Sequence, residues 1–347
     1  MSRIAVITSG QPFGRGGHLV IARSLVEALR AAGHLAEVVV TPQNRFGRQG
    51  GAYLAAWVTD VGRAQDGGRI DQVITLRYPS YAVRHDTHVC WLTHRMREYY
   101  DLWGAFYASL GAGQRVKEQV RRRLIHVADR VLLTHNVDRL FAISATVQGR
   151  LRRWGGLTSE VLRPPPPHRA YRCEGYGDYV FAASRLTPLK RLDLLVRALA
   201  CPEAHAVQCV IAGDGDMRDD LHALTRDLGL ESRVHLVGEV DDATLLDHLA
   251  RCRAVCFPTW QEDYGFVTVE AFASRKAVVT CEDSGGAAEL VHDAVEGYVV
   301  RPEPAHLATA LAALVADEAL ARRLGEAGWR AASAMTWDRV VERLVVV

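Results

Sequence analysis

Two glutamates in the second half of the chain have a spacing suited to the recognition of hydroxyl groups. Glu262 and Glu270 are separated by seven residues, in a stretch that begins after an apolar run. This pattern predicts Glu262 in a turn and Glu270 one or two turns into the next helix, on the same side. An ionised carboxylate accepts two hydrogen bonds from a vicinal diol. Two glutamates on an exposed helix are the alternative, which the apolar neighbours Phe266, Val267 and Val269 weaken.

Two basic residues precede this pair in the chain. Arg185 and Lys190 lie just beyond a strand that we expect over Tyr179–Ala183. A guanidinium is a planar fork and an ammonium is a point charge, and together they suit the binding of a diphosphate. A solvated basic loop is the alternative, and it would be the better interpretation of two cations alone.

Glycine-rich turns stand at two places where a strand is followed by a helix. The first runs from Gly10 to Gly17, and the second contains Gly285 and Gly286. Such turns let backbone amides approach a phosphate at a helix N-terminus, although many merely provide a positive φ angle. The glycines at 10, 14, 16 and 17 do not form the G-x-G-x-x-G pattern, which argues against a nicotinamide dinucleotide site.

Two further motifs have a structural and a functional interpretation. His94 follows an apolar strand, where a lone histidine is more often a structural residue than a functional one. Asp214-Gly215-Asp216 matches the D-x-D pattern of metal-dependent enzymes, but it follows a strand and opens a helix. We therefore expect helix capping there, and no metal.

The elements that position these residues alternate along the chain, as in parallel-sheet α/β domains. Short β-branched runs alternate with amphipathic stretches, and the run Pro164–Pro167 predicts a stiff connector between two doubly wound domains. Strands are expected at Ile4–Thr8, Ala36–Val40, Gln72–Leu76, Val89–Leu92, Leu140–Ile143, Tyr179–Ala183, Gln208–Ala212, Val234–Val237, Ala254–Phe257, Val278–Cys281 and Tyr298–Val300, and helices at Leu19–Ala32, Arg115–Ala128, Ala145–Arg153 and after Pro304.

Length and composition agree with two globular domains. The 347 residues are 49% hydrophobic and 24% charged, which excludes disordered and coiled-coil classes. No apolar run is long enough for a membrane helix, the N-terminus does not resemble a signal peptide, and the seven cysteines show no disulfide pattern. We expect a cytoplasmic protein. The net charge of +2 divides into +11 for residues 1–165 and −9 for residues 166–347.

Together, these motifs resemble retaining glycosyltransferases of family four. The resemblance rests on Arg185 with Lys190, on Glu262-x7-Glu270, and on Gly285-Gly286 followed by Glu289, in that order along the chain. It implies the GT-B architecture, with two facing Rossmann-like domains and a cleft between them. Residues 1–165 would bind the acceptor, and residues 166–347 would bind a nucleoside diphosphate sugar, the donor.

The resemblance also implies a role for each matching residue. Arg185 and Lys190 would hold the diphosphate, Glu262 would contact the transferred sugar, and Glu270 would bind the ribose diol. The remaining donor contacts would come from Gly16, Gly17, Gly238, Val240, Tyr264, Gly265 and Phe266, and His94 would lie beside the acceptor. One departure is Arg191, because the family often has a glycine after the phosphate lysine.

The sequence therefore predicts sugar transfer with retention of configuration, without a metal or other cofactor. A sugar-nucleotide epimerase or hydrolase, and a non-catalytic glycan-binding or partner subunit, remain alternatives. The basic first half favours an anionic acceptor, either a small molecule or a glycan. Nucleic acid is not expected, because no aromatic residues interleave the basic runs around Arg115–Arg123 and Arg150–Arg153. These runs are either solvated helix faces or a surface for peripheral contact with anionic lipid at the inner face of a membrane.

Overall fold

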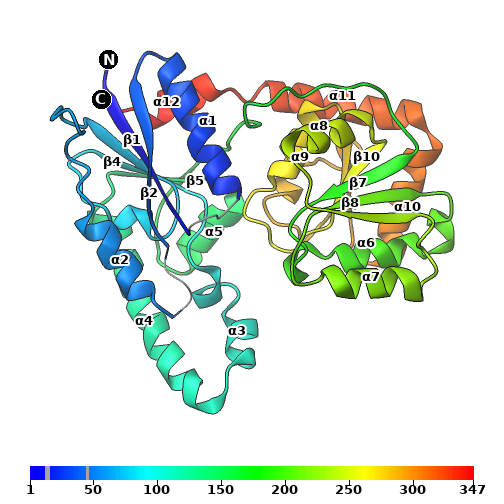
Figure 1. Cartoon of the computed structure of the whole chain (residues 1–347), viewed down its shortest axis with the longest axis horizontal. Coiled ribbons are helices and arrows are strands. Elements are labelled where there is room, and N and C mark those ends of the chain that lie inside the picture. Colours follow the sequence, from blue (N-terminus) through cyan, green and yellow to red (C-terminus); the bar gives the residue numbers. More distant parts are fainter. Residues whose placement is uncertain (12–15, 44–46) are drawn as a thin grey trace. The chain divides into compact units, whose positions relative to one another are not determined.

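The chain folds into two compact units. A computed structural model describes residues 1–11, 16–43 and 47–347 (Figure 1). Unit 1 consists of Met1–Pro164 together with Thr336–Val347, and unit 2 consists of Pro165–Met335. The sequence interpretation assigned the last twelve residues to the second domain, whereas they belong to unit 1. Because they add two basic and two acidic residues to unit 1, the charges of +11 and −9 are unchanged.

Unit 1 is built on a parallel sheet with strand order β2-β1-β3-β4-β5-β6. Side chains of β1 and β4 are buried on both faces, which explains their near-continuous apolar sequence. The strands are β1 (Arg3–Gly10), β2 (Leu35–Pro42), β3 (Gln72–Thr75), β4 (His88–Leu92), β5 (Arg139–Ala142) and β6 (Glu160–Val161). The sequence predicts the first five, whereas the two-residue β6 is too short to leave a pattern.

Helices cover this sheet and extend beyond it. They are α1 (Gly17–Ala31), α2 (Gln49–Val58), α3 (Trp103–Ser109), α4 (Ala112–His135), α5 (Ala145–Arg153) and α12 (Trp337–Leu344). Ser144 caps α5 by accepting a hydrogen bond from the amide of Val147. Helix α4 is longer at both ends than the sequence predicts. Helices α2 and α3 were not predicted.

The C-terminal segment is tied into unit 1 by polar and aromatic contacts. The side-chain amide of Gln72 donates to the carbonyl of Leu344 at 2.6 Å, and its oxygen accepts from the amide of Val346 at 2.9 Å. The Trp337 ring meets the buried Trp91 ring edge to face, with centroids 6.2 Å apart. Unit 1 is therefore complete only when both parts of the chain are present.

Unit 2 repeats the architecture with strand order β12-β11-β10-β7-β8-β9, again parallel. The strands are β7 (Tyr179–Ala183), β8 (Gln208–Ala212), β9 (Val234–Gly238), β10 (Ala254–Phe257), β11 (Ala277–Cys281) and β12 (Gly297–Val300), all predicted to within one residue. The helices are α6 (Leu192–Leu199), α7 (Arg218–Asp227), α8 (Asp242–Arg251), α9 (Phe266–Ala273), α10 (Pro304–Ala316) and α11 (Glu318–Ser333). Helix α6 packs against α10, and α9 packs against α11 (Figure 1).

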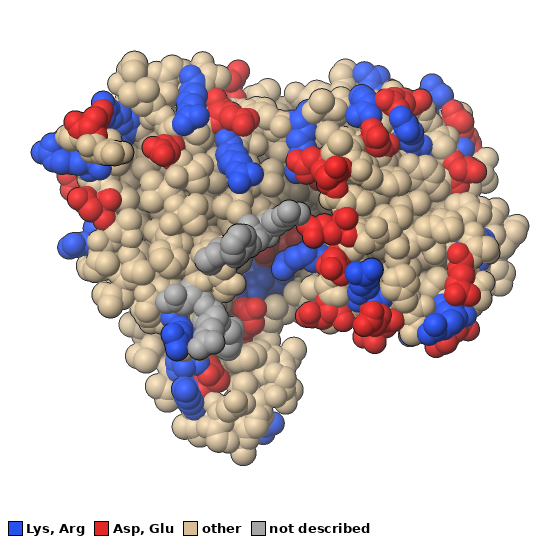
Figure 2. Space-filling view, in the orientation of Figure 1, with Lys and Arg blue, Asp and Glu red and all other residues tan. Residues whose placement is uncertain are grey.

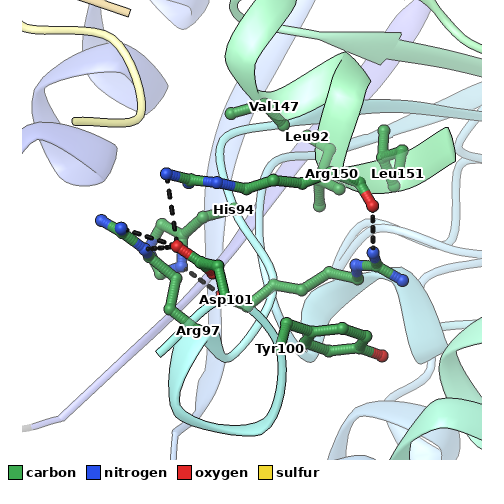
Figure 3. A pocket seen from close by; sticks show the side chains of 9 residues that line it. Leu92, His94, Arg97, Tyr100, Asp101, Val147, Arg150 and Leu151 are labelled. Carbon is green, nitrogen blue, oxygen red and sulfur yellow. Dashed lines mark hydrogen bonds and ion pairs between the residues drawn. The ribbon is translucent and has the colours of Figure 1, made fainter. Parts of the chain in front are cut away.

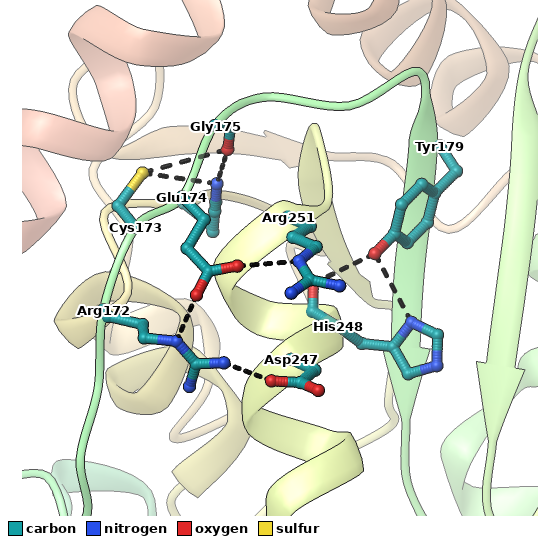
Figure 4. A network of polar contacts seen from close by, with 9 residues as sticks. Arg172, Cys173, Glu174, Gly175, Tyr179, Asp247, His248 and Arg251 are labelled. Atoms are coloured by element: carbon teal, nitrogen blue, oxygen red, sulfur yellow. Dashed lines mark hydrogen bonds and ion pairs between the residues drawn. The ribbon is translucent and has the colours of Figure 1, made fainter.

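The segment before β7 is held against α8 by a network of ion pairs (Figure 4). Glu174 accepts from Arg172 at 2.6 Å and from Arg251 at 2.7 Å, and Arg172 also pairs with Asp247. The network is partly exposed, so its contribution to stability is small, but it directs the path of the chain into β7.

Candidate functional site

The candidate donor residues follow strands whose carboxyl ends meet at one edge of the unit 2 sheet. Strands β11, β10 and β7 are neighbours, and the loops after them span residues 282–287, 258–265 and 184–191. Open α/β sheets bind ligands at this edge, because helix N-termini and strand ends converge there.

Lys190 and Glu262 form the centre of this site. Lys190 Nζ lies 2.5 Å from Glu262 Oε2, and the same oxygen accepts from the Thr259 hydroxyl at 3.0 Å. The Lys190 ammonium also lies 5.1 Å from the centre of the Phe257 ring. The two side chains are 12% and 21% exposed, so both can still meet a ligand. The structure thus brings together two residues that the sequence places 72 positions apart.

Arg191 stands where the resemblance would lead one to expect a glycine, and its side chain has a structural role of its own. Its backbone is left-handed, with φ 48° and ψ 40°, a conformation that costs a non-glycine residue about 1 kcal/mol. The guanidinium makes two hydrogen bonds to Asp283, at 2.6 and 2.8 Å, and others to the carbonyls of Pro258 and Thr259 at 2.7 Å. These bonds tie the loop after β7 to the loops after β10 and β11.

The second glycine turn packs directly on the loop that carries Glu262. The Glu262 amide donates to the Ser284 carbonyl at 3.0 Å, and the Gly286 amide donates to the Glu262 carbonyl at 2.8 Å. Gly285 has φ +64°, and a Cβ there would lie 2.7 Å from the Glu262 carbonyl oxygen. A Cβ at Gly286 would lie 2.5 Å from the Asp263 carbonyl oxygen. These glycines are therefore required by a close approach of two backbones.

Glu270 lies in α9, as the spacing predicts, and is 6% exposed. Its Oε1 accepts from Arg169 Nη1 at 2.7 Å and from the Tyr171 hydroxyl at 3.2 Å. Burial raises the pKa of Glu270 to about 7, although Arg169 and Tyr171 favour its ionised form and oppose this shift. Arg169 also lies 3.3 Å from Asp242.

The residues between the two glutamates have structural roles. The Tyr264 side chain is buried, and its ring meets the ring of Phe266 edge to face at 5.1 Å. Gly265 precedes α9 with φ +92°, and a Cβ there would lie 2.8 Å from the Ala287 side chain. Tyr264 is therefore a core residue, and its side chain is closed to a ligand.

The other predicted donor residues of unit 2 lie at the same sheet edge. Arg185 follows β7 and is exposed, and no residue of the described ranges 1–11, 16–43 and 47–347 pairs with its guanidinium. Gly238 ends β9 with φ +75°, and its carbonyl accepts from the Gly213 amide at 2.7 Å. Val240 follows it and is half-buried.

The D-x-D motif does not cap a helix, so that expectation is wrong. Asp214 accepts from the amide of Gly215 at 2.9 Å, and α7 begins only at Arg218, without a side-chain cap. Gly213 and Gly215 have φ of +139° and +155°, so the motif bends sharply before the helix. Among the described residues, no group of three His, Cys, Asp or Glu is placed to hold a metal ion.

The remaining predicted residues belong to unit 1. Gly16 is the residue before α1, and Gly17 is its first residue, while the turn residues 12–15 lie outside the described part of the chain. His94 Nδ1 lies 2.7 Å from the carbonyl of Arg95.

His94 lines a pocket of unit 1 that is rich in arginine (Figure 3). The pocket is formed by Leu92, His94, Arg95, Arg97, Tyr100, Asp101, Val147, Arg150 and Leu151, with an empty volume of about 270 Å³ that includes open solvent. Asp101 lies 2.7 Å from Arg97 and 3.3 Å from Arg150. Arg95 stacks on the Tyr100 ring at 3.9 Å and donates to the Arg150 carbonyl. Three guanidiniums and one carboxylate leave an excess of positive charge.

Several residues of the site were not predicted from the sequence. Arg169, Tyr171, Thr259 and Asp283 all contact a predicted residue, but no spacing connects them to it. Arg191 was noticed only as a departure from the usual glycine. The sequence does hold one indication of its role. An arginine, whose guanidinium carries five N–H donors, follows the lysine at a strand-to-helix turn, where it can bond to neighbouring loops.

Comparison with known proteins shows which family unit 2 belongs to. A model of the glycosyl transferases group 1 family matches residues 174–330, which lie within unit 2. Unit 2 belongs to the glycosyl transferases group 1 family. Over 171 residues the chain is 33% identical to a D-inositol 3-phosphate glycosyltransferase of Nocardia farcinica, a match that covers 46% of this chain and 38% of that protein. The first curated relatives are matched over 32% to 46% of their length.

Solved structures place the group 1 domain in a known architecture. A sucrose-phosphate synthase from Thermosynechococcus elongatus is similar with a TM-score of 0.77 and 19% identity, covering 99% of this chain and 97% of that one. Anabaena HepE, solved in complex with UDP and glucose, is similar with a TM-score of 0.69 and 19% identity, covering 98% of each chain. The two parallel sheets therefore have the GT-B fold, as the sequence predicts.

Proposed function

We propose that this chain transfers a sugar from a nucleoside diphosphate sugar to an acceptor, with retention of configuration. The observation that carries the proposal is the Lys190–Glu262 contact of 2.5 Å at the strand ends of a group 1 domain. A cation and a sugar-binding carboxylate then meet where the diphosphate and the transferred sugar must be adjacent.

The basic residues supply the electrostatic part of this chemistry. When the bond between the sugar C1 and the diphosphate oxygen breaks, negative charge develops on the leaving group. Lys190 and the exposed Arg185 would stabilise that charge, and one such donor is typically worth about 3 kcal/mol. With two cations in this role, we propose that transfer needs no metal.

Retention is proposed to follow from substitution on the face that the diphosphate leaves. The acceptor oxygen forms the new bond to C1, and its proton passes to an oxygen of the departing diphosphate. The hydrogen bonds that Glu262 accepts from Lys190 and Thr259 engage its Oε2, which favours a binding role over that of a nucleophile. Glu270 would accept hydrogen bonds from the ribose diol.

The acceptor is proposed to carry an anionic group. The arginine pocket beside His94 supports this, because an anion could share Arg97 and Arg150 with Asp101. The net charge of unit 1, which is +11, also favours an anionic acceptor. A relative named for an inositol phosphate substrate makes an inositol phosphate a sensible first acceptor to test.

The experiment that tests the proposal is a screen for donors, followed by measurement of donor turnover. UDP-, GDP- and ADP-sugars are compared by thermal shift, because a ligand that binds the native state raises its apparent stability. UDP-sugars are tried first, since HepE was solved with UDP. The stabilising donor is then incubated with phosphorylated and neutral acceptors, in excess EDTA and with added Mn²⁺. Transfer in EDTA, lost in Glu262→Gln, supports the proposal. Donor hydrolysis at the same rate without any acceptor, or donor binding without turnover, would contradict it.

A further inference from the structure

Helix α4 carries a continuous apolar stripe on its exposed side. Five side chains between 50% and 70% exposed recur along its 24 residues: Val116, Val120, Leu124, Val127 and Val131. At about 100° per residue, they fall within about 80° of the helix circumference. No exposed set of comparable length occurs on another helix in the described part of the chain.

The opposite side of α4 is buried in unit 1, so the direction of the stripe is fixed. Glu118, Ile125, Asp129 and Leu133 are the buried residues of the helix, and they are centred about 180° from the stripe. Asp129 is fully buried and accepts hydrogen bonds from the hydroxyls of Tyr53, Tyr81 and Tyr100. Turning the stripe inward would break these bonds.

The charged residues that flank the stripe are all basic. Lys117 lies about 60° from its centre on one side, and Arg123 and Arg130 lie about 60° and 80° away on the other, all exposed. Both acidic residues of α4, Glu118 and Asp129, are buried on the inner side. In Figure 2, basic side chains lie on the lower-left part of the view, where Figure 1 places α4. An apolar band between two basic margins matches the acyl and headgroup layers of an anionic lipid surface.

We propose that α4 docks this protein on the surface of a membrane that contains anionic lipid. The charge arrangement favours lipid over a second copy of the chain, since two copies of the same helix would bring basic margins together. The spacing of the stripe also argues against pairing with a second copy of α4. Its apolar residues recur about every 3.75 residues, whereas a left-handed coiled coil requires a repeat of 3.5. No described helix is apolar and long enough to cross a bilayer, so contact through α4 would be peripheral.

The proposal is tested by co-sedimentation of the full chain with vesicles. Vesicles of phosphatidylcholine alone are compared with vesicles of phosphatidylcholine and phosphatidylglycerol, at low and high salt. Binding is expected only with phosphatidylglycerol and is expected to weaken with salt. Each basic residue near an anionic membrane is worth about fivefold in affinity, so replacing Lys117, Arg123 and Arg130 with Gln should weaken binding by about a hundredfold.

Matched variants separate the stripe from general effects of charge and polarity. Replacing Arg23, Arg226 and Arg301 with Gln changes the net charge equally at exposed sites elsewhere, and should leave vesicle binding unchanged. Leu124→Gln with Val127→Gln should abolish binding, whereas the exposed Val295→Gln should not. Because these side chains are exposed, all variants should unfold at the native temperature, which circular dichroism checks.

Three outcomes would overturn the proposal. One is that the native chain does not sediment with anionic vesicles. Another is that both triple variants lose binding to the same extent. The third is a dimer in sedimentation velocity that Leu124→Gln with Val127→Gln converts to a monomer, which would assign the stripe to a second copy. None of these depends on sugar transfer, so the proposal fails or holds separately from the proposed function.

Discussion

Arg169 Nη1 lies 2.7 Å from Glu270 Oε1, joining the segment that enters unit 2 to the helix after β10. The Arg169 side chain is 16% exposed and that of Glu270 is 8% exposed, so the pair is shielded from water. A ribose diol that binds Glu270 would therefore meet a carboxylate that already accepts two hydrogen bonds.

Nucleotide affinity should rise with pH because of Glu270. Burial raises the pKa of Glu270 to about 7, and only the ionised carboxylate accepts hydrogen bonds from both hydroxyls of a diol. We expect the affinity for a nucleoside diphosphate to increase by up to about tenfold between about pH 6 and pH 8. Glu270→Gln should bind weakly, with a smaller pH dependence. Titration calorimetry checks this, and equal pH profiles for the two proteins would rule it out.

The same carboxyl should make stability depend on pH in the opposite sense. Its pKa is higher in the folded state than the usual 4.5, so the folded state holds the proton more tightly. The resulting contribution, about 3 kcal/mol, is present below about pH 4.5 and lost as pH rises through 7. Denaturant unfolding of the native protein minus that of Glu270→Gln should show this decline. A difference that grows with pH would contradict it.

Removal of the Lys190 charge should slow the chemical step. Lys190→Ala is expected to lower kcat for donor turnover by about 10²-fold to 10³-fold, because one electrostatic donor to the leaving group is lost. Lys190→Arg should recover part of the rate, since it restores the charge but not the contact geometry. The matched control is Lys117→Ala in unit 1, assayed without lipid, which should keep the native rate. Release of nucleoside diphosphate measures turnover, and an unchanged kcat in Lys190→Ala would refute this role.

Gly285 and Gly229 form a pair that separates steric clash from backbone strain. Their φ angles are +64° and +65°, but only at Gly285 would a Cβ meet other atoms. Gly229→Ala should cost about 1 kcal/mol of unfolding free energy, from the left-handed backbone alone. Gly285→Ala should cost more and weaken nucleotide binding, because the loop that carries Glu262 must shift. Urea unfolding and calorimetry compare them, and equal losses in both variants would contradict the clash.

Arg191 should stabilise unit 2 despite its left-handed backbone. Arg191→Gly relieves about 1 kcal/mol of strain but loses the bonds to Asp283 and to the two carbonyls, so it should be destabilising by about 2 kcal/mol. Arg191→Ala loses the same bonds without the relief, and should be less stable than Arg191→Gly. Denaturant unfolding gives both values. A glycine variant as stable as the native protein would mean that the guanidinium bonds contribute nothing.

Most sheet strands could be predicted from the sequence because they are short, largely apolar runs between helical stretches, whereas β6 is too short to leave such a pattern. The strand over Tyr179–Ala183 was predicted with its observed bounds, as was that over Gln208–Ala212. Helix α3 could not be predicted, since none of its residues is buried and no apolar period marks it. The end of α4 at His135 was missed because its outer apolar residues obscure the amphipathic pattern.

The candidate site was predictable where its residues lie in local motifs. Glu262 and Lys190 each stand at a strand-to-helix turn, and Glu270 lies in the helix that follows Glu262. Lys190 and Glu262 do meet. The Arg169–Glu270 contact joins residues 101 positions apart, and no local pattern predicts such a pairing. The role of Arg191 was also hidden, because its partners Pro258 and Asp283 come from two other loops.

Unit 1 is made of the two ends of the chain, and this bears on the order of events during synthesis. A ribosome produces residues 165–335 before residues 336–347, so the whole of unit 2 emerges while unit 1 still lacks α12. Domains generally fold as units during translation. The unfinished unit 1 would expose the Trp91 face that Trp337 later covers, and would leave Gln72 without the backbone of Leu344. The earlier-made half of the nascent chain is thus the later to mature.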